Sequence, residues 1–206
     1  MTEAVQPLTV LYPHEHVGDS DDGPLASCGR PTCQVQIELR TADGAPVATG
    51  DVGEIVIAHQ GIGRVAFWRR PDLLAESVRD GWFHTGDLGR FDEQGFLHIV
   101  GRNKDMIISG GFNVYAREVE DALASHPAVA DAAVLGRPDA EWGEVVVAFV
   151  VLRAAHVADA ATLQAHCVAR IAGYKKPRHI TFVDALPRNA AGKVLKGALR
   201  ESALAR

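Results

Sequence analysis

The sequence predicts an α+β protein in which a β-rich first half is followed by a half that alternates strands and helices. Residues 34–40 (QVQIELR) alternate polar and apolar side chains, as a strand with one buried face does. In residues 116–127 (AREVEDALASHP) the spacing i, i+3, i+4, i+7 predicts a helix, with one face made of Val119, Ala122, Leu123 and His126. With 206 residues, the chain is long enough for one large domain or two small ones.

The rest of the first half is expected to form strands joined by turns. Asp43-Gly44 is a strong hairpin signal, and residues 53–58 (GEIVIA) form the next predicted strand. Pro71 lies at the first position of a short predicted helix, where a residue without an N–H is tolerated. Two apolar runs around residues 92–95 predict a second hairpin.

The second half predicts a compact unit of strands and helices. Residues 129–136 (VADAAVLG) and 144–152 (EVVVAFVVL) are expected to be strands, the second buried on both faces. Asp159 is suited to cap a helix, residues 179–184 (HITFVD) form another strand, and a last helix begins at Val194. We therefore expect two domains, residues 1–103 and residues 104–206, the second of a normal domain size.

Composition argues against several classes of protein. A net charge of −5 does not favour nucleic-acid binding. No apolar run reaches the roughly 18 residues of a transmembrane helix, and the first residues do not look like a secretory signal. Cys28, Cys33 and Cys167 are an odd number without a disulfide framework, which indicates reduced thiols in the cytoplasm. The spacing of His14-Glu15-His16 fits no common metal site.

Four stretches, in a fixed order along the chain, carry the functional signal. They are MTE at residues 1–3, GWFHTGDLGRF at residues 81–91, GRNKDMIISGGFNVYAREVE at residues 101–120 and LPRNAAGKVLK at residues 186–196. Together they closely resemble the acyl-adenylate-forming superfamily of acyl-CoA synthetases, luciferases and the adenylation domains of peptide synthetases. The resemblance covers essentially the whole chain. It implies the β-rich end of the large AMP-binding domain in residues 1–103, and the complete small C-terminal lid domain, a short sheet flanked by helices, in residues 104–206.

The resemblance implies a two-step ligase reaction that uses a small-molecule carboxylic acid, ATP and coenzyme A (CoA). The carboxylate attacks the α-phosphorus of ATP and releases pyrophosphate, and the CoA thiolate then displaces AMP from the acyl-adenylate. Lys193 matches the catalytic lysine of the family, whose fixed charge would stabilise the charge that develops in the first step. An arbitrary lysine is usually a solvated side chain, but Leu186, Pro187, Arg188 and Gly192 complete the family motif around this one.

Further residues match the nucleotide contacts of the family. Asp87 resembles an aspartate that accepts hydrogen bonds from both ribose hydroxyls, and Arg102 resembles the second ribose contact. The structural alternative for Asp87 is a turn aspartate after Gly86. Thr2 and Glu3 match the end of a motif in which the threonine contacts phosphate and the glutamate helps to hold Mg²⁺, an ion that prefers oxygen ligands.

The resemblance also implies a hinge and a CoA site. Lys104 matches the hinge about which the C-terminal domain rotates between the two half-reactions. Gly110 and Gly111 match a loop that approaches the pantetheine arm of CoA, although a glycine pair alone would indicate only a turn. Lys176 and Arg178 resemble positions that meet the phosphates or adenine of CoA, and a solvated basic face is the alternative.

The chain begins inside the threonine–glutamate motif. We therefore expect the pyrophosphate loop, most of the nucleotide pocket and the acid pocket of the family to lie outside these residues, and the segment alone to be inactive or nearly so. The resemblance favours medium or long-chain fatty acids and leaves aryl acids open. A non-catalytic lid module that binds a partner or CoA, and an adenylation domain that loads a carrier protein, are the alternative functions. The oligomeric state is also open.

Overall fold

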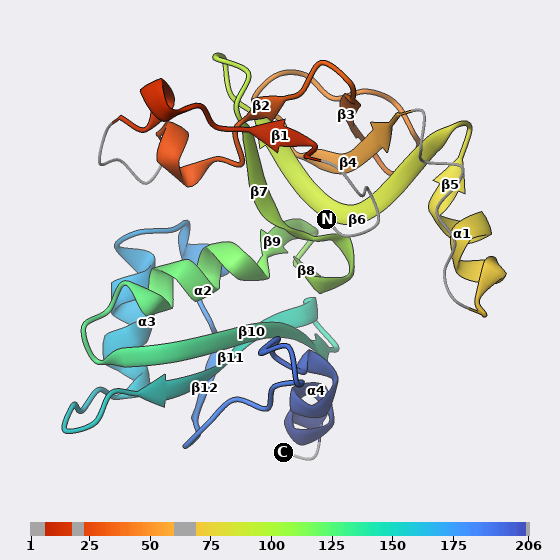
Figure 1. The fold of residues 1–206 in the computed structure, drawn as a ribbon. Helices are drawn as coiled ribbons and strands as arrows, with labels where there is room; N and C mark the ends of the chain where they lie inside the picture. Colours follow the sequence, from red (N-terminus) through yellow and green to blue (C-terminus); the bar gives the residue numbers. More distant parts are fainter. Residues whose placement is uncertain (1–6, 18–22, 60–68, 205–206) are drawn as a thin grey trace. The chain divides into compact units, whose positions relative to one another are not determined.

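The computed structural model describes residues 7–17, 23–59 and 69–204 of the chain (Figure 1). The chain divides into two compact units, Met1–Asn103 and Lys104–Arg206. In the described residues the units combine β-sheets with four α-helices, so the predicted α+β class is confirmed. No helix in the described ranges is long and apolar enough to cross a membrane.

The first unit is built on a five-stranded antiparallel sheet with the strand order β3-β4-β6-β5, in which β7 also pairs with β6. Its strands are β3 (Gln36–Arg40), β4 (Gly53–Ala58), β5 (Val78–Arg79), β6 (Trp82–Phe91) and β7 (Leu97–Arg102). The other elements are β1 (Thr9–Val10), which pairs with β2 (Arg30–Pro31), helix α1 (Pro71–Ser77), and 3-10 turns at Pro13–Glu15 and Pro24–Ala26. The predicted strands, the helix opened by Pro71 and the hairpin around residues 92–95 are all present.

Side chains on one face of the strands form a core in the described part of this unit. Six buried residues form it: Val35, Leu39, Ile55, Ile57, Phe83 and Leu97. The Asp43-Gly44 turn forms, since the N–H of Thr41 donates to the carbonyl of Ala45 at 2.8 Å, but it does not join β3 directly to β4. Residues 41–52 separate the two strands, and within them Pro46 forms an isolated bridge with Arg40, next to a hydrogen bond that the N–H of Val47 donates to the carbonyl of Leu39 at 3.0 Å.

The second unit contains a mixed sheet with the strand order β10-β11-β8-β9, in which β12 pairs in parallel with β11. Its strands are β8 (Met106–Ser109), β9 (Phe112–Tyr115), β10 (Val129–Asp139), β11 (Gly143–Leu152) and β12 (His179–Phe182). Its helices are α2 (Ala116–Ala124), α3 (Ala160–Val168) and α4 (Lys196–Leu204), with 3-10 turns at Asn103–Asp105 and Gly173–Lys175. Asp159 caps α3 as predicted, by accepting the N–H of Thr162 at 2.8 Å.

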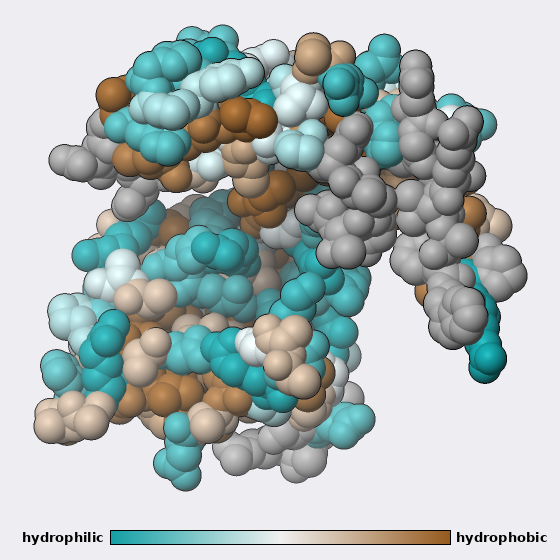
Figure 2. All heavy atoms as spheres, viewed as in Figure 1, coloured by the Kyte–Doolittle hydropathy of each residue, from teal (hydrophilic) through white to brown (hydrophobic). Residues whose placement is uncertain are grey.

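Strand β11 is buried on both faces because helices cover both sides of the sheet. Val146, Ala148 and Val150 belong to one core, which includes residues of α2 and α3. The intervening Val145 and Val147 belong to a second core, which includes residues of α4. This arrangement explains why the strand is an uninterrupted apolar run. Figure 2 shows the mostly hydrophilic surface of this unit, with hydrophobic residues gathered over β11 and β12.

One helix start and one hairpin in this unit differ from the prediction. Helix α2 ends at Ala124, shortly before Pro127, a residue that cannot continue a helix. Helix α4 begins at Lys196 rather than Val194, because Val194 bridges to Arg188 and the N–H of Leu195 donates to the carbonyl of Pro187 at 2.8 Å. The Gly110-Gly111 segment is a tight turn between two short strands, β8 and β9, that the sequence pattern did not reveal.

Candidate functional site

Asp87 lies in an irregular stretch of β6. Glu54 of β4 pairs with Leu88 and Val56 pairs with His84, so Thr85, Gly86 and Asp87 together oppose the single residue Ile55. Gly86 adopts a left-handed backbone conformation, with φ of 71°. Extra residues of this kind bend a strand and turn a side chain out of the regular ladder. The sequence motif HTGD is therefore a bulge that redirects Asp87.

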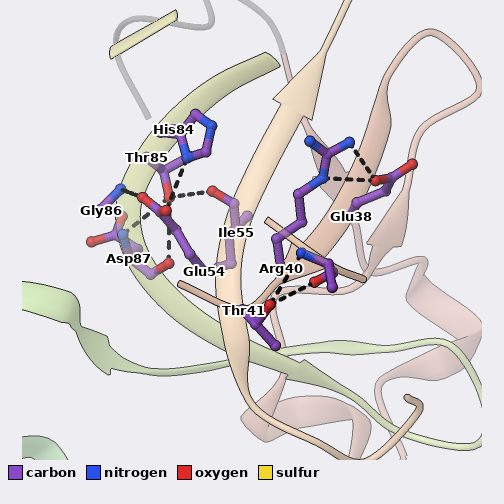
Figure 3. Close-up of polar contacts among 10 residues, drawn as sticks. Glu38, Arg40, Thr41, Glu54, Ile55, His84, Thr85, Gly86 and Asp87 are labelled. Carbon is purple, nitrogen blue, oxygen red and sulfur yellow. Dashed lines mark hydrogen bonds and ion pairs between the residues drawn. The ribbon is translucent and has the colours of Figure 1, made fainter. Parts of the chain in front are cut away.

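Two side chains satisfy the backbone of this bulge (Figure 3). Oε1 of Glu54 accepts the N–H of Gly86 at 3.1 Å, and Oε2 of the same carboxylate lies 2.9 Å from Nδ1 of His84. The hydroxyl of Thr85 donates to the carbonyl of Ile55 at 2.8 Å and accepts the N–H of Asp87 at 3.0 Å. The backbone of Asp87 is thus fixed by hydrogen bonds, and its carboxylate remains accessible to solvent, with a third of the side chain exposed.

Arg102 lies directly opposite Asp87 on β7. Its Nε is 3.1 Å from Oδ1 of Asp87, so the structure brings together the two residues predicted to contact a ribose. Both side chains are partly exposed, and an ionised carboxylate accepts several hydrogen bonds at once. The pair can therefore bind a ligand hydroxyl without dismantling its own contact. Thr2 and Glu3 lie outside the described residues.

Lys104 is exposed at the first residue of the second unit, in the turn Asn103–Asp105. Its carbonyl is 3.4 Å from a guanidinium nitrogen of Arg200, which belongs to α4. A backbone held by one side chain and otherwise exposed can change its dihedral angles with few contacts to break. This geometry is compatible with the hinge predicted from the resemblance.

Gly110 and Gly111 form the turn between β8 and β9. Both have positive φ angles, 59° and 82°. The N–H of Gly110 donates to the carbonyl of Trp142 at 2.9 Å, and a Cβ atom on Gly110 would lie 2.7 Å from Cε3 of the Trp142 ring. A side chain at Gly110 would therefore displace the indole, whereas one at Gly111 would point into open space.

Next to this turn lies a pocket of about 620 Å³ within the second unit. The predicted residues Lys176 and Arg178 line it, together with three exposed or half-exposed aromatic side chains: Phe112, Trp142 and Tyr174. The guanidinium carbon of Arg178 lies 4.2 Å from the centroid of the Trp142 ring. The Phe112 and Tyr174 rings lie 4.9 Å apart. Flat aromatic faces beside two cations suit a planar, anionic ligand.

Sequence reasoning missed the aromatic part of this pocket. The three rings come from β9, from the turn before β11 and from the turn Gly173–Lys175, and no periodicity joins them. The only available signal was that each ring is a large apolar residue beside glycine or lysine in the chain.

Lys193 is exposed on the loop before α4. The side-chain oxygen of Asn189 accepts the N–H groups of Ala191 and Lys193, at 3.1 and 2.9 Å. The N–H of Asn189 donates to the carbonyl of Lys193 at 2.9 Å. Gly192 has a φ of 80°, which permits this tight turn. The loop is ordered by its own side chains although it carries little apolar surface.

In the segment His14-Glu15-His16, the central carboxylate has structural partners. Glu15 is buried, pairs with Arg30 at 2.8 Å and accepts the N–H of Tyr12 at 2.9 Å. Its carboxylate is therefore occupied by structural partners. Within the described ranges, no three His, Cys, Asp or Glu side chains gather as metal ligands would.

Known proteins match the chain over both units. The family model of the AMP-binding enzyme C-terminal domain matches residues 118–193. A medium/long-chain-fatty-acid–CoA ligase, FadD8 of Mycobacterium tuberculosis, is 43% identical over 201 residues, which cover 94% of this chain and 35% of that relative. The chain belongs to the acyl-adenylate-forming superfamily.

Other superfamily members align equally well. A feruloyl-CoA synthase of an Amycolatopsis species is 42% identical over 200 residues, which cover 97% of this chain and 40% of the relative. The structure of the o-succinylbenzoate CoA synthetase MenE of Bacillus subtilis, in complex with its acyl-adenylate intermediate, superimposes with a TM-score of 0.85 at 37% identity, and the match covers 97% of this chain and 40% of that one. The chain thus spans 35% to 40% of the length of these superfamily members.

Proposed function

We propose that the chain is the C-terminal part of an AMP-forming acid–thiol ligase, which converts a carboxylic acid, ATP and CoA into acyl-CoA, AMP and pyrophosphate. Residues 1–103 would be the end of the large AMP-binding domain, and residues 104–206 the lid domain that rotates about Lys104. Support comes from the superfamily membership and from relatives that are named as a fatty-acid–CoA ligase and a feruloyl-CoA synthase. We propose the cytoplasm as its compartment, because its substrates would be ATP and CoA and its three cysteines are free thiols.

The pocket beside the β8–β9 turn is the observation that carries the CoA part of this proposal. CoA ends in an adenine ring and a cluster of phosphates, and the pocket offers aromatic rings together with Lys176 and Arg178. Gly110 and Gly111 lie next to it, where a narrow pantetheine arm would pass. A domain that loads a carrier protein meets the pantetheine arm on the carrier and not on CoA, so in the thioester-forming step it has no need of a pocket for the adenine and phosphates of CoA.

The nucleotide of the first step would be held by Asp87 and Arg102, whose contact leaves carboxylate oxygen free for ribose hydroxyls. Lys193 would stabilise the charge that builds on the α-phosphate as the substrate carboxylate attacks it. One MenE structure contains ATP and a magnesium ion, and we propose the same pair here. Thr2 and Glu3 would then contact the phosphate and the metal ion.

Two chemical classes of carboxylic acid, fatty acids and aryl acids, are candidates for the substrate. Relatives at 43% and 42% identity are named for fatty acids and for ferulic acid, so the degree of identity does not select one. We propose a medium or long-chain fatty acid as the first class to test, with aryl acids as the alternative. A longer protein that contains these residues should be assayed for pyrophosphate release with a panel of both classes.

The CoA site can be tested on the chain itself by titration calorimetry. We expect CoA to bind, pantetheine to bind more weakly, and Lys176→Ala and Arg178→Ala each to weaken CoA binding at least fivefold. Arg153→Ala, which removes an exposed arginine of the same unit that does not line the pocket, serves as the charge-matched control. Equal binding of CoA and pantetheine would favour the carrier-loading alternative.

A chimera tests the ligase chemistry. Residues 1–206 would replace the matching segment of the Bacillus subtilis synthetase, which supplies the rest of an active site for o-succinylbenzoate. We expect pyrophosphate release, and its loss in Lys193→Ala. A folded chimera that binds CoA but releases no pyrophosphate would favour the non-catalytic lid module instead.

A further inference from the structure

We propose that Arg188 and Asp131 are positioning residues for Lys193, because they fasten the loop that carries this lysine to strand β10. The inference rests on the catalytic role proposed for Lys193. It assigns a role to a side chain of the loop motif and to a residue 57 positions earlier in the chain, which belongs to no motif.

The first observation is the fork of the Arg188 guanidinium. Its Nη1 donates to the carbonyl of Gly192 at 2.5 Å, and its Nη2 donates to Oδ2 of Asp131. The Gly192 carbonyl belongs to the peptide bond that joins Gly192 to Lys193. One planar cation therefore links the peptide of the catalytic lysine to the sheet, which a lysine in place of Arg188 could not do with the same rigid geometry.

The second observation is the way in which Asp131 itself is fixed. It follows a bulge in β10, since Val129 pairs with Leu152 and Asp131 with Val151, which leaves Ala130 as an extra residue. A bulge redirects the side chains that follow it. Oδ1 of Asp131 accepts the N–H of Ala132 at 3.0 Å, so Oδ2 is presented to Arg188 from a carboxylate that is already oriented.

A second attachment lies on the other side of Lys193. Nζ of Lys196, the first residue of α4, lies 2.8 Å from Oε1 of Glu120 and 2.9 Å from the carbonyl of Val134. The same Glu120 oxygen accepts the N–H of Val134 at 2.9 Å. Both polar backbone groups of Val134 are thus satisfied by side chains, at a point where β10 is the outer strand among the described strands of its sheet.

The loop is therefore held to β10 at two points. Arg188, which precedes Lys193, binds Asp131, and Lys196, which follows Lys193, binds the carbonyl of Val134. A cation that stabilises developing charge is most effective when its position is set before the reaction, because no reorganisation is then needed. Surface ion pairs contribute little to global stability. Loss of the Arg188–Asp131 pair should consequently change the placement of Lys193 much more than it changes folding.

The first test uses the chain alone. Backbone ¹⁵N relaxation should give Lys193 an order parameter near 0.8, and Arg188→Ala should lower it below about 0.6 while the values in β10 and β11 stay unchanged. Arg188→Lys should give an intermediate value. Arg117→Ala breaks another exposed arginine–aspartate pair, Arg117–Asp121 on α2, and should leave the Lys193 value unchanged. An unchanged Lys193 value in Arg188→Ala overturns the proposal.

The second test measures the two half-reactions in the chimera described above. Arg188→Ala and Asp131→Asn should lower kcat for adenylate formation, by about 10- to 100-fold for the arginine variant, with little change in the KM for ATP. Transfer of the acyl group from supplied acyl-AMP to CoA should keep its rate. In a Lys193→Ala background, Arg188→Ala should cause no further loss, whereas a general structural defect would add to it.

The outcomes separate the two proposals. If Lys193→Ala retains adenylate formation, the proposed role of this lysine is wrong and the positioning role falls with it. If Lys193→Ala abolishes adenylate formation while Arg188→Ala keeps the unmodified rate, only the positioning role is overturned.

Discussion

Oε1 of Glu54 accepts a hydrogen bond from the backbone N–H of Gly86 at 3.1 Å, across 32 residues of sequence. The other oxygen of the same carboxylate lies 2.9 Å from Nδ1 of His84 (Figure 3). Glu54 is outside the HTGD motif, yet both of its oxygens contact that motif. The bulge that redirects Asp87 therefore depends on a largely buried glutamate in the neighbouring strand.

Replacement of Glu54 by alanine should destabilise the first unit. The N–H of Gly86 and the ring of His84 would each lose a partner in a site where the side chains are less than one-fifth exposed. Unsatisfied groups of this kind cost about 1–3 kcal/mol. Urea denaturation should show a lower midpoint, and the amide resonances of Gly86 and Asp87 should shift.

Glu38→Ala is the matched control for this variant. Glu38 lies on β3 of the same sheet and pairs with Arg40 at 2.8 Å, but 43% of its side chain is exposed. Exposed ion pairs contribute about 0–1 kcal/mol. Equal destabilisation by both substitutions would mean that the effect comes from the loss of one negative charge on the sheet and not from the contacts of Glu54 with Gly86 and His84.

The contrast between regular and irregular parts explains what the sequence could predict. Strand β3 was predictable because its alternation reflects one buried face, and β4 because it is a short apolar run in which Ile55, Val56 and Ile57 are all buried. The three-residue bulge at Thr85–Asp87 was not, because hydrogen bonds between backbone groups and the side chains of Glu54 and Thr85 hold it, and these bonds leave no periodic pattern in the sequence. The two sequence motifs that contain Asp87 and Arg102 could nevertheless be recognised, and the structure places these residues opposite each other on neighbouring strands.

Gly110→Ala should perturb Trp142, whereas Gly111→Ala should not. Both glycines have positive φ angles, so the backbone strain of an alanine is present at each position. Only at Gly110 would the new methyl group lie 2.7 Å from the indole ring. The indole N–H resonance of Trp142 should shift in the first variant alone, and CoA binding should weaken more there. Identical indole spectra in the two variants would contradict this packing.

The same turn shows a second limit of prediction. Gly110 and Gly111 could be located from the chain, but the ring that makes Gly110 irreplaceable follows about 30 residues later and reaches it through the pairing of β8 with β11. Lys176 and Arg178 were likewise proposed from the resemblance, while the aromatic side chains that line the same pocket became visible only in the fold.

Cys167 should react far more slowly with thiol reagents than the other two cysteines. It is completely buried between α3 and the sheet, and burial raises the pKa of its thiol to about 11. The thiolate is the reactive form. In mildly alkaline buffer, Ellman's reagent should label the exposed Cys28 and Cys33 first, and Cys167 only on unfolding. Cys28→Ser/Cys33→Ser should abolish the fast phase, and a fast phase that survives would place Cys167 at the surface.

The stability of the second unit should fall in mild acid because of His166. Desolvation, and then the positive charges of Arg170 and His126, lower the pKa of His166 below its ordinary value of 6.5. Its ring makes an edge contact with His126 at 4.8 Å, and its Nε2 lies 2.9 Å from the hydroxyl of Ser125. The unfolded chain therefore binds a proton more readily than the folded chain does, so stability is full above pH 6.5 and declines as the pH falls below it.

His166→Gln should flatten this decline, because glutamine does not titrate and keeps a polar group near Ser125. The melting temperature of the variant should fall less than that of the unmodified chain between about pH 7 and about pH 5, where the unfolded chain takes up a proton at this position more readily than the folded chain does. His156→Gln removes an exposed histidine of the same unit and serves as the control. An acid decline that is the same in His166→Gln and in the unmodified chain would assign the effect to other groups.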